Sequence, residues 1–403
     1  MFLQSKTKVS PAFNDYVGQI ARLIKSRNGK QLSSLLTEDN PLNKNDLMSL
    51  SPEMLSGLVA SKLSSFEFIG DLLLYKRSIE VAHNDVGALE MATTSLRKLT
   101  NVYLAEDNEW LFPVFSHVTV LCRKLAGRLD IESASQKWTK KLVEIYRELF
   151  AILHKERERL PGTAWLTCQL LHLFMALDQV KLCSHILAAL SQSLVKEGGF
   201  DPDSVPRPIA VTLYYYWARF LVMDGKVIEA REKLEWAFVK CARHARNRRR
   251  IAEYLIPCMI ATGSVPREQF IRECGLDHFI GLAKAIRIGD VATYNKLMEE
   301  DLLLLAQSGT LILMEKCKLI CYRNLTKRVS IIMRELGSDE SKLDLVGFEA
   351  AWNLLEGASR DELICALADL IYSGAVKGYL APDHGKLVLS KASSFPPIAS
   401  VVG

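Results

Sequence analysis

One pattern recurs along the middle of the chain and limits the possible folds most: an apolar helix, a tight corner and a second amphipathic helix. It occurs in three stretches, LLHLFMALDQVKLCSHIL (170–187), YYYWARFLVMDGKVIEAREKLEWAF (214–238) and GLAKAIRIGDVATYNKLM (281–298). The corners fall at Asp178, Asp224-Gly225 and Gly289-Asp290. A helical hairpin of this kind buries its apolar face only by stacking on a neighbour. The sequence therefore predicts stacked, irregularly spaced helical hairpins of tetratricopeptide (TPR) type.

The pattern changes after Gly309, where three further helices are expected. They cover 310–333 (as one helix or two), 343–355 and 359–374. Ser359 and Glu362 have the spacing of a capping box at the start of the third helix, and Gly374 is expected to end it.

Two short β-type runs follow the third helix, Val376–Leu380 and Lys386–Ser390, with the turn Pro382–Gly385 between them. Apolar and polar residues alternate along the first run, which predicts that Lys377 faces solvent while Val376 and Leu380 face the core. Three helices followed by a small hairpin predict a winged-helix domain, in which the hairpin is the wing.

The fold class predicted is therefore all-α: helical repeats followed by a C-terminal winged helix. The expected organisation is N-terminal helical repeats at 1–160, a TPR-like part at 161–309, a winged helix at 310–397 and a tail at 398–403. No apolar run reaches the roughly 20 residues of a membrane helix, and the start MFLQSKTKVS does not look like a secretory signal. We expect a protein of the cytoplasm or nucleus that does not enter a membrane.

The sequence offers no pattern of a catalytic or metal site. The nine cysteines are scattered and read as reduced thiols among apolar neighbours. Cys317 and Cys321 are one helical turn apart, but no second pair of ligands lies near them in sequence. His172 lies between two leucines and reads as a core or groove residue. Phosphate-binding loops, dinucleotide fingerprints, nucleophile elbows and H-E-x-x-H are absent, so we expect no enzyme and no cofactor.

Several stretches resemble the PCI-domain-containing protein 2 family. They are TCQLLHLFMALDQVKLC (167–183), VTLYYYWARF (211–220), NRRRIAEYLIPCMIATG (247–263), CYRNLTKRV (321–329) and LADLIYSGAVKGYLAPDHGKLVLSK...FPP (367–397). The sequence departs from the family at Thr326, where an apolar residue is usual, and in a denser basic run at 246–250.

The resemblance implies stacked helices that end in a winged helix, together known as a PCI domain. It also implies a non-catalytic role in messenger RNA export, at the nucleus and the nuclear pore. The partners implied are a large PCI-bearing scaffold of Sac/GANP type and a small acidic disordered subunit shared with the proteasome lid.

A run of basic residues precedes and opens the helix expected near 250. Six of them fall between 240 and 250, where the chain has no Asp or Glu: Lys240, Arg243, Arg246, Arg248, Arg249 and Arg250. Guanidinium groups match both carboxylates and phosphates. Arg246, Arg248, Arg249 and Arg250 are therefore candidates for binding an acidic partner or a phosphate backbone. The alternative is a solvated helix junction, or arginines paired with acidic residues of the next repeat.

Charges in the winged helix are balanced in number but separated in sequence. Lysines and arginines gather on the first helix and the wing, whereas the third helix carries Asp361, Glu362 and Asp369. An acidic helix is repelled by the major groove, so sequence-specific DNA reading is not expected. The predicted contacts to an RNA or DNA backbone, single- or double-stranded, are Arg323, Lys327, Arg328, Lys377, Lys386 and Lys391. The alternative is that the wing lysines only keep the sheet edge soluble.

Two functions fit these observations. The first is a scaffold subunit of a nuclear mRNA export complex, which docks a PCI partner and binds nucleic acid through paired winged helices. The second is a signalosome-associated or proteasome-lid-like PCI subunit without nucleic-acid binding.

Overall fold

The computed structural model describes residues 11–37, 42, 44–48, 51–63, 65–193, 200–242, 246–353 and 359–400. The chain forms two compact units, Met1–Leu213 and Tyr214–Gly403. The boundary between them falls within helix α11 (Arg207–Met223).

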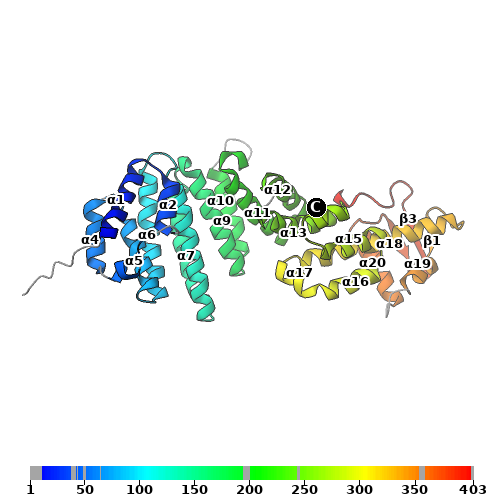
Figure 1. Ribbon diagram of the computed structural model, residues 1–403. Helices are drawn as coiled ribbons and strands as arrows, with labels where there is room; N and C mark the ends of the chain where they lie inside the picture. Colours follow the sequence, from blue (N-terminus) through cyan, green and yellow to red (C-terminus); the bar gives the residue numbers. More distant parts are fainter. Residues whose placement is uncertain are drawn as a thin grey trace, which may run out of the picture. The chain divides into compact units, whose positions relative to one another are not determined.

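The N-terminal unit is built from helices (Figure 1). They are α1 (Pro11–Lys25), α2 (Gly29–Thr37), α3 (Lys44–Met48), α4 (Pro52–Lys62), α5 (Phe68–Glu80), α6 (Asp85–Ala105), α7 (Phe112–Glu132), α8 (Lys137–Leu153), the 3-10 turn η1 (Arg157–Arg159), α9 (Leu160–Ala176), α10 (Lys181–Ser193) and η2 (Pro202–Ser204). α6 packs between α5 and α7, and α9 packs against α8 and α10. Apolar residues at helical spacing, such as Leu89, Leu96 and Tyr103 of α6, are fully or almost fully buried between neighbours.

The C-terminal unit continues with helical hairpins and ends in a small sheet. Its helices are α12 (Val227–Lys240), α13 (Arg246–Ala261), α14 (Glu268–Glu273), α15 (His278–Ile288), α16 (Val291–Glu300), α17 (Leu302–Ser308), α18 (Leu311–Glu335), α19 (Leu345–Trp352) and α20 (Arg360–Tyr372). Its strands are β1 (Lys342–Asp344), β2 (Gly378–Ala381) and β3 (Lys386–Leu389), with the 3-10 turns η3 (Pro382–His384) and η4 (Ile398–Ser400).

Helix α18 joins the two parts of this unit (Figure 1). It is one continuous helix of 25 residues, which settles the choice between one helix and two at 310–333. It packs against α13, α15 and α16 of the hairpins and also against α19 and α20 of the winged helix. The winged helix is therefore built directly on the last helix of the repeats.

The corners predicted from the sequence are confirmed. Asp178 (φ 56°), Gly225 (φ 84°) and Gly289 (φ 76°) all adopt the left-handed conformation that reverses the chain between two helices. At Gly289 a side chain would also collide with the backbone of α18, because an added Cβ atom would lie 2.4 Å from the Leu325 nitrogen. Glycine at this corner therefore allows the hairpin to pack closely on α18.

The winged-helix signals also hold in the structure. The Ser359 hydroxyl accepts from the Glu362 amide at 3.2 Å, and the Glu362 carboxylate accepts from the Ser359 amide at 2.9 Å, which completes the capping box. Gly374 (φ 75°) follows the end of α20, and Gly385 (φ 59°) closes the turn between β2 and β3.

The sheet has three strands, not the two expected for the wing. Its order is β1-β3-β2, and all pairs are antiparallel. The short strand β1 occupies the start of the range predicted as the helix 343–355. Leu343 is fully buried between exposed Lys342 and Asp344, so three residues satisfy strand alternation before α19 begins at Leu345. A run this short carries too weak a sequence pattern to predict.

The architecture confirms the predicted class of stacked helical repeats followed by a winged helix. The finer boundaries expected at 160, 309 and 397 stay predictions. Across the described ranges, no helix has the length and apolar character needed to cross a membrane.

Candidate nucleic-acid and partner-binding surfaces

The cations predicted on α18 lie in two different environments. Arg323 is buried, with 7% of its surface exposed, whereas Lys327 and Arg328 are exposed one turn later. Arg323 Nε donates to the Ala375 carbonyl at 3.2 Å and Nη2 donates to the Pro396 carbonyl at 2.6 Å. Burial also lowers the pKa of this guanidinium. The prediction of Arg323 as a nucleic-acid contact is therefore wrong, because its donors are used inside the protein.

Arg323 instead fastens the segment that follows the wing. The Phe395 ring centroid lies 5.7 Å from Arg323 Cζ, and the Lys377 amide donates to the Ser394 carbonyl at 2.8 Å. Further along, Ile398 lies so close to Gly263 that a Cβ atom added there would come within 2.9 Å of the Ile398 Cβ. Residues 390–398 thus run from the sheet across α18 to the end of α13.

Lys327 and Arg328 differ in how freely they can meet a ligand. Arg328 Nη1 donates to the Ile288 carbonyl at 3.0 Å, at the C-terminal end of α15, where a cation is favoured. Part of its hydrogen-bonding capacity is therefore already used. Lys327 is exposed on the same turn and remains a candidate phosphate contact.

The three wing lysines lie at the surface, as predicted. Lys377 and Lys391 are exposed, and Lys386 is half-buried, with its Nζ 3.0 Å from Asp344 Oδ1. Leu387 and Leu389 of β3 are buried on the core side, so Lys386 lies on the opposite, outer face of the sheet. The structure therefore brings Lys377 and Lys386 to one side of the sheet, although Asp344 neutralises part of the charge of Lys386.

Helix α20 occupies the position of a recognition helix and presents carboxylates to solvent. Asp361, Glu362 and Asp369 are all exposed on it. Its one cation, Arg360, is paired with Glu349 at 2.8 Å. A phosphate backbone is repelled from this surface, which leaves the sheet and α18 as the candidate contact surfaces of the winged helix.

The arginine run opens α13. Arg246, Arg249 and Arg250 are exposed in its first turns, whereas Arg248 is half-buried with its Cζ 4.1 Å from the Phe238 ring centroid. Arg243 lies outside the described residues. Positive charge at the N-terminal end of a helix is unfavourable, because the helix dipole is positive there. Glu253 of the same helix interacts electrostatically with Arg249 and Arg250, but their exposed guanidinium groups can still meet an anionic partner.

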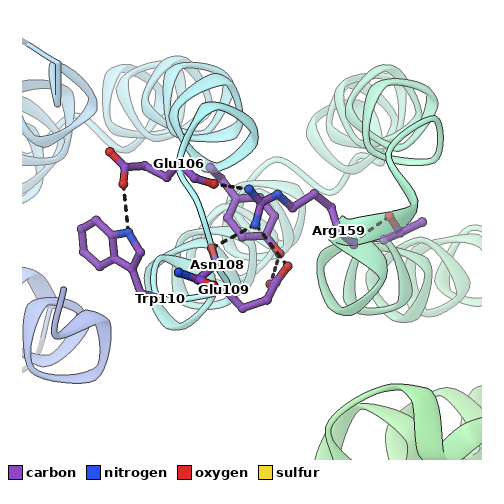
Figure 2. A network of polar contacts seen from close by, with 7 residues as sticks. Glu106, Asn108, Glu109, Trp110 and Arg159 are labelled. Carbon is purple, nitrogen blue, oxygen red and sulfur yellow. Dashed lines mark hydrogen bonds and ion pairs between the residues drawn. The ribbon is translucent and has the colours of Figure 1, made fainter.

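A polar network in the N-terminal unit was missed by sequence reasoning (Figure 2). Arg159, at the end of η1, points into the loop between α6 and α7 and donates to the carbonyl oxygens of Glu106 and Asn108, the latter at 2.9 Å. It also lies 3.5 Å from Glu109 Oε1, and its Cζ is 5.2 Å from the Tyr103 ring centroid. Trp110 Nε1 donates to Glu106 Oε2 at 3.2 Å.

This network holds several helices of the N-terminal unit together. The Tyr103 hydroxyl donates to Glu109, and burial followed by this hydrogen bond raises the pKa of Tyr103. An Arg, Glu and Tyr in contact resemble catalytic groups, but here the arginine is 7% exposed and its donors meet loop carbonyls. We assign the network a structural role. No sequence signal could have found it, because Arg159 is about fifty positions from its acceptors.

The remaining candidate ligands are also accounted for. Arg123 Nη1 lies 2.9 Å from His172 Nε2, which fits the reading of His172 as a hydrogen-bonded groove residue. Cys321 is buried, and burial raises the pKa of its thiol to about 12. In the ranges that the structure describes, no group of three or more His, Cys, Asp or Glu side chains is placed to hold a metal ion.

Helical hairpins that lead into a winged helix through one shared helix, here α18, are the architecture expected of a PCI-domain protein. No family model matches the chain. The curated proteins that are similar to it support the class of PCI-domain protein. The chain is 30% identical over 311 residues to a PCI domain-containing protein 2 homolog of Drosophila melanogaster, covering 73% of this chain and 75% of the relative.

Two further relatives extend the comparison. PCI domain-containing protein 2 of Xenopus laevis is 28% identical over 407 residues, covering 96% of this chain and 98% of the relative. A Protein CSN12 homolog of Gibberella zeae is 28% identical over 234 residues, covering 52% of this chain and 51% of the relative. The chain belongs to the PCI domain-containing protein 2 family.

Proposed function

We propose that this protein is a non-catalytic subunit of a nuclear mRNA export complex that couples transcription to export and binds nucleic acid through its winged helix. The observation that carries the proposal is the distribution of charge over that domain. Exposed lysines lie at the outer side of the sheet, while the exposed charges of α20 are acidic apart from Arg360, which is paired with Glu349. Such a surface attracts a phosphate backbone but does not insert a helix into the major groove.

The expected ligand is the backbone of RNA or of single- or double-stranded DNA, without sequence preference. Lys327, Lys377, Lys386 and Lys391 are the contacts that the structure leaves at the surface, with Arg328 in a secondary role. Four separate lysines suit backbone contacts, since each neutralises a phosphate without reading a base.

The protein partners proposed are a PCI-bearing scaffold of Sac/GANP type and a small acidic disordered subunit. A second winged helix from the scaffold would extend the basic surface. Arg246, Arg249 and Arg250 suit the acidic subunit, because they are exposed at a helix end where their charge is otherwise unfavourable. We propose that the complex acts in the nucleus, at the nuclear pore.

The test is the salt dependence of RNA binding by the scaffold-bound protein. Replacing Lys377, Lys386 and Lys391 by Ala should weaken binding and flatten the plot of log affinity against log salt by up to about two units, at about 0.7 per contact for a single strand. The melting temperature should barely change, because these side chains lie outside the core. An unchanged affinity and slope would remove the wing from the binding surface.

A second candidate is a signalosome-associated or proteasome-lid-like subunit that binds no nucleic acid. The similarity to a Protein CSN12 homolog favours it. The same titration separates the two, because this candidate requires that the assembled wild-type complex shows no salt-dependent binding of RNA.

A further inference from the structure

The outer face of the wing sheet carries one exposed aromatic residue. Tyr379 lies in the middle of β2, and 60% of its surface is exposed. Its neighbours in sequence explain this: Val376 is buried and Leu380 packs against the core cluster of the winged helix, so Tyr379 faces away from that core. Most of the surface of this ring is therefore open to a ligand on the outer face of the sheet.

The strand register places this ring among lysines. Tyr379 pairs with Val388 of β3, which in turn pairs with Lys342 of β1, so the three side chains form one row across the sheet. In the next row, Ala381 pairs with Lys386, which pairs with Asp344. Lys377 precedes β2 on the same side as Tyr379. Adjacent strands lie about 4.8 Å apart, so Lys342 is roughly 10 Å from Tyr379.

This arrangement is suited to an unpaired base and not to a base pair. The face of a tyrosine ring stacks on any base, and surrounding lysines attract the phosphates on either side. Val388 on the neighbouring strand is a half-buried aliphatic side chain beside the ring, at the close cross-strand distance of a sheet. Bases in a duplex already stack on one another and cannot use the ring.

We propose that Tyr379 is a base-stacking site for single-stranded nucleic acid, with Lys342, Lys377 and Lys386 holding the backbone beside it. The inference rests on the proposed function and makes it more specific: the wing then favours single strands over duplexes. The charge of the outer face argues for nucleic acid over an apolar protein partner, since three lysines and one paired aspartate surround the ring.

The experiment compares three probes with the full-length chain: oligothymidylate, an abasic deoxyribose-phosphate strand of equal length and a DNA duplex. Tyr379→Ala should weaken binding of oligothymidylate about tenfold, as expected for one lost base stack, and leave the other two probes unchanged. Tyr379→Phe should bind like the wild type, because stacking needs the ring and not the hydroxyl. Tyr372→Ala is the matched control, since Tyr372 is 95% exposed but lies on α20.

A fluorescent base, 2-aminopurine, placed in the oligonucleotide provides a direct readout. Its emission should fall on binding to the wild type and to Tyr379→Phe but not to Tyr379→Ala. If the wild type binds all three probes and Tyr379→Ala binds them equally well, the stacking site is refuted while backbone binding stands. If neither the free nor the scaffold-bound wild type binds any probe, the proposed function itself fails. Loss of scaffold assembly in Tyr379→Ala with unchanged nucleic-acid binding would assign the ring to a protein interface and overturn the inference.

Discussion

The network around Arg159 in the N-terminal unit and the outer face of the wing sheet in the C-terminal unit use basic residues in opposite ways. Arg159 is buried, and its donors meet loop carbonyls and a carboxylate (Figure 2). Lys342 and Lys377 are exposed beside an exposed tyrosine; Asp344 is already paired with Lys386, and Asp339 interacts electrostatically with Lys342. A buried cation whose donors are used within the protein stabilises the fold, whereas an exposed cation is accessible to a ligand.

Arg323 shows that burial, not position in the sequence, separates the two groups. It lies on α18 four residues before Lys327, within the predicted binding set, yet it donates to two carbonyls as Arg159 does. Charge counted along a sequence therefore overestimates a binding surface wherever an arginine fastens a loop.

The largest effect is expected at Arg159. Arg159→Ala should lower the free energy of unfolding by about 3 kcal/mol, because it leaves two loop carbonyls without their donor and Glu109 without its cation. Urea denaturation measures the change, with Arg147→Ala, an exposed arginine of α8, as the control expected within about 0.5 kcal/mol. Equal stability of the two variants would contradict the structural role of the network.

Arg323→Ala should cost about 2 kcal/mol, because the carbonyls of Ala375 and Pro396 lose their donors and the segment after the wing loses its anchor. Lys327→Ala on the same helix should leave stability unchanged and weaken RNA binding. Thermal unfolding and an RNA titration of both variants give the answer. A larger loss of stability in Lys327→Ala than in Arg323→Ala would contradict the structural role of Arg323.

Arg249 and Arg250 are the exposed arginines of α13 whose binding role can be tested by charge reversal. Changing both to Glu should reduce binding of an acidic partner peptide at least about tenfold, since two attractive contacts become repulsive, with helicity by circular dichroism unchanged. Arg248→Ala should instead cost about 0.5–1 kcal/mol of stability, because Arg248 stacks on Phe238. A collapse of the circular dichroism spectrum in the double variant would make these arginines structural.

Asp130 is a buried carboxylate, and it predicts that stability depends on pH. Its oxygens accept from the amides of Trp138 and Thr139 at 2.9 and 2.8 Å, at the start of α8. Burial raises its pKa, but hydrogen bonds from the Thr139 side chain, from these two amides and from Ser135 outweigh burial, so the pKa of Asp130 is lowered overall. The stabilisation is therefore present above the unfolded pKa of about 3.9 and is lost as the pH falls through the lower folded value.

Asp130→Asn should accordingly cost about 1 kcal/mol at neutral pH and progressively less in acid, as measured by urea denaturation at several pH values. Asp344→Asn is the control, because Asp344 is exposed and its pair with Lys386 should contribute little to stability. A cost for Asp130→Asn that does not change with pH would show that the charge of Asp130 is unimportant.

Local patterns of sequence were enough to predict the helices, their corners and the winged helix. Asp178, Gly225 and Gly289 were found from chain reversal between apolar stripes, and Ser359 with Glu362 from the spacing of a capping box. These features depend on residues close together in the chain, where periodicity and backbone conformation decide the outcome. The strand β1 was missed because three residues carry too little alternation.

Only the tertiary structure decided which charged side chains are buried. Arg323 and Lys327 are both basic residues of α18 and look alike in sequence, yet the carbonyls that bury Arg323 come from residues 52 and 73 positions away. The Arg159 network and the row that joins Lys342, Val388 and Tyr379 likewise connect distant segments. A sequence read locally specifies helices and turns, whereas the burial of a charge depends on partners that only the folded chain brings together.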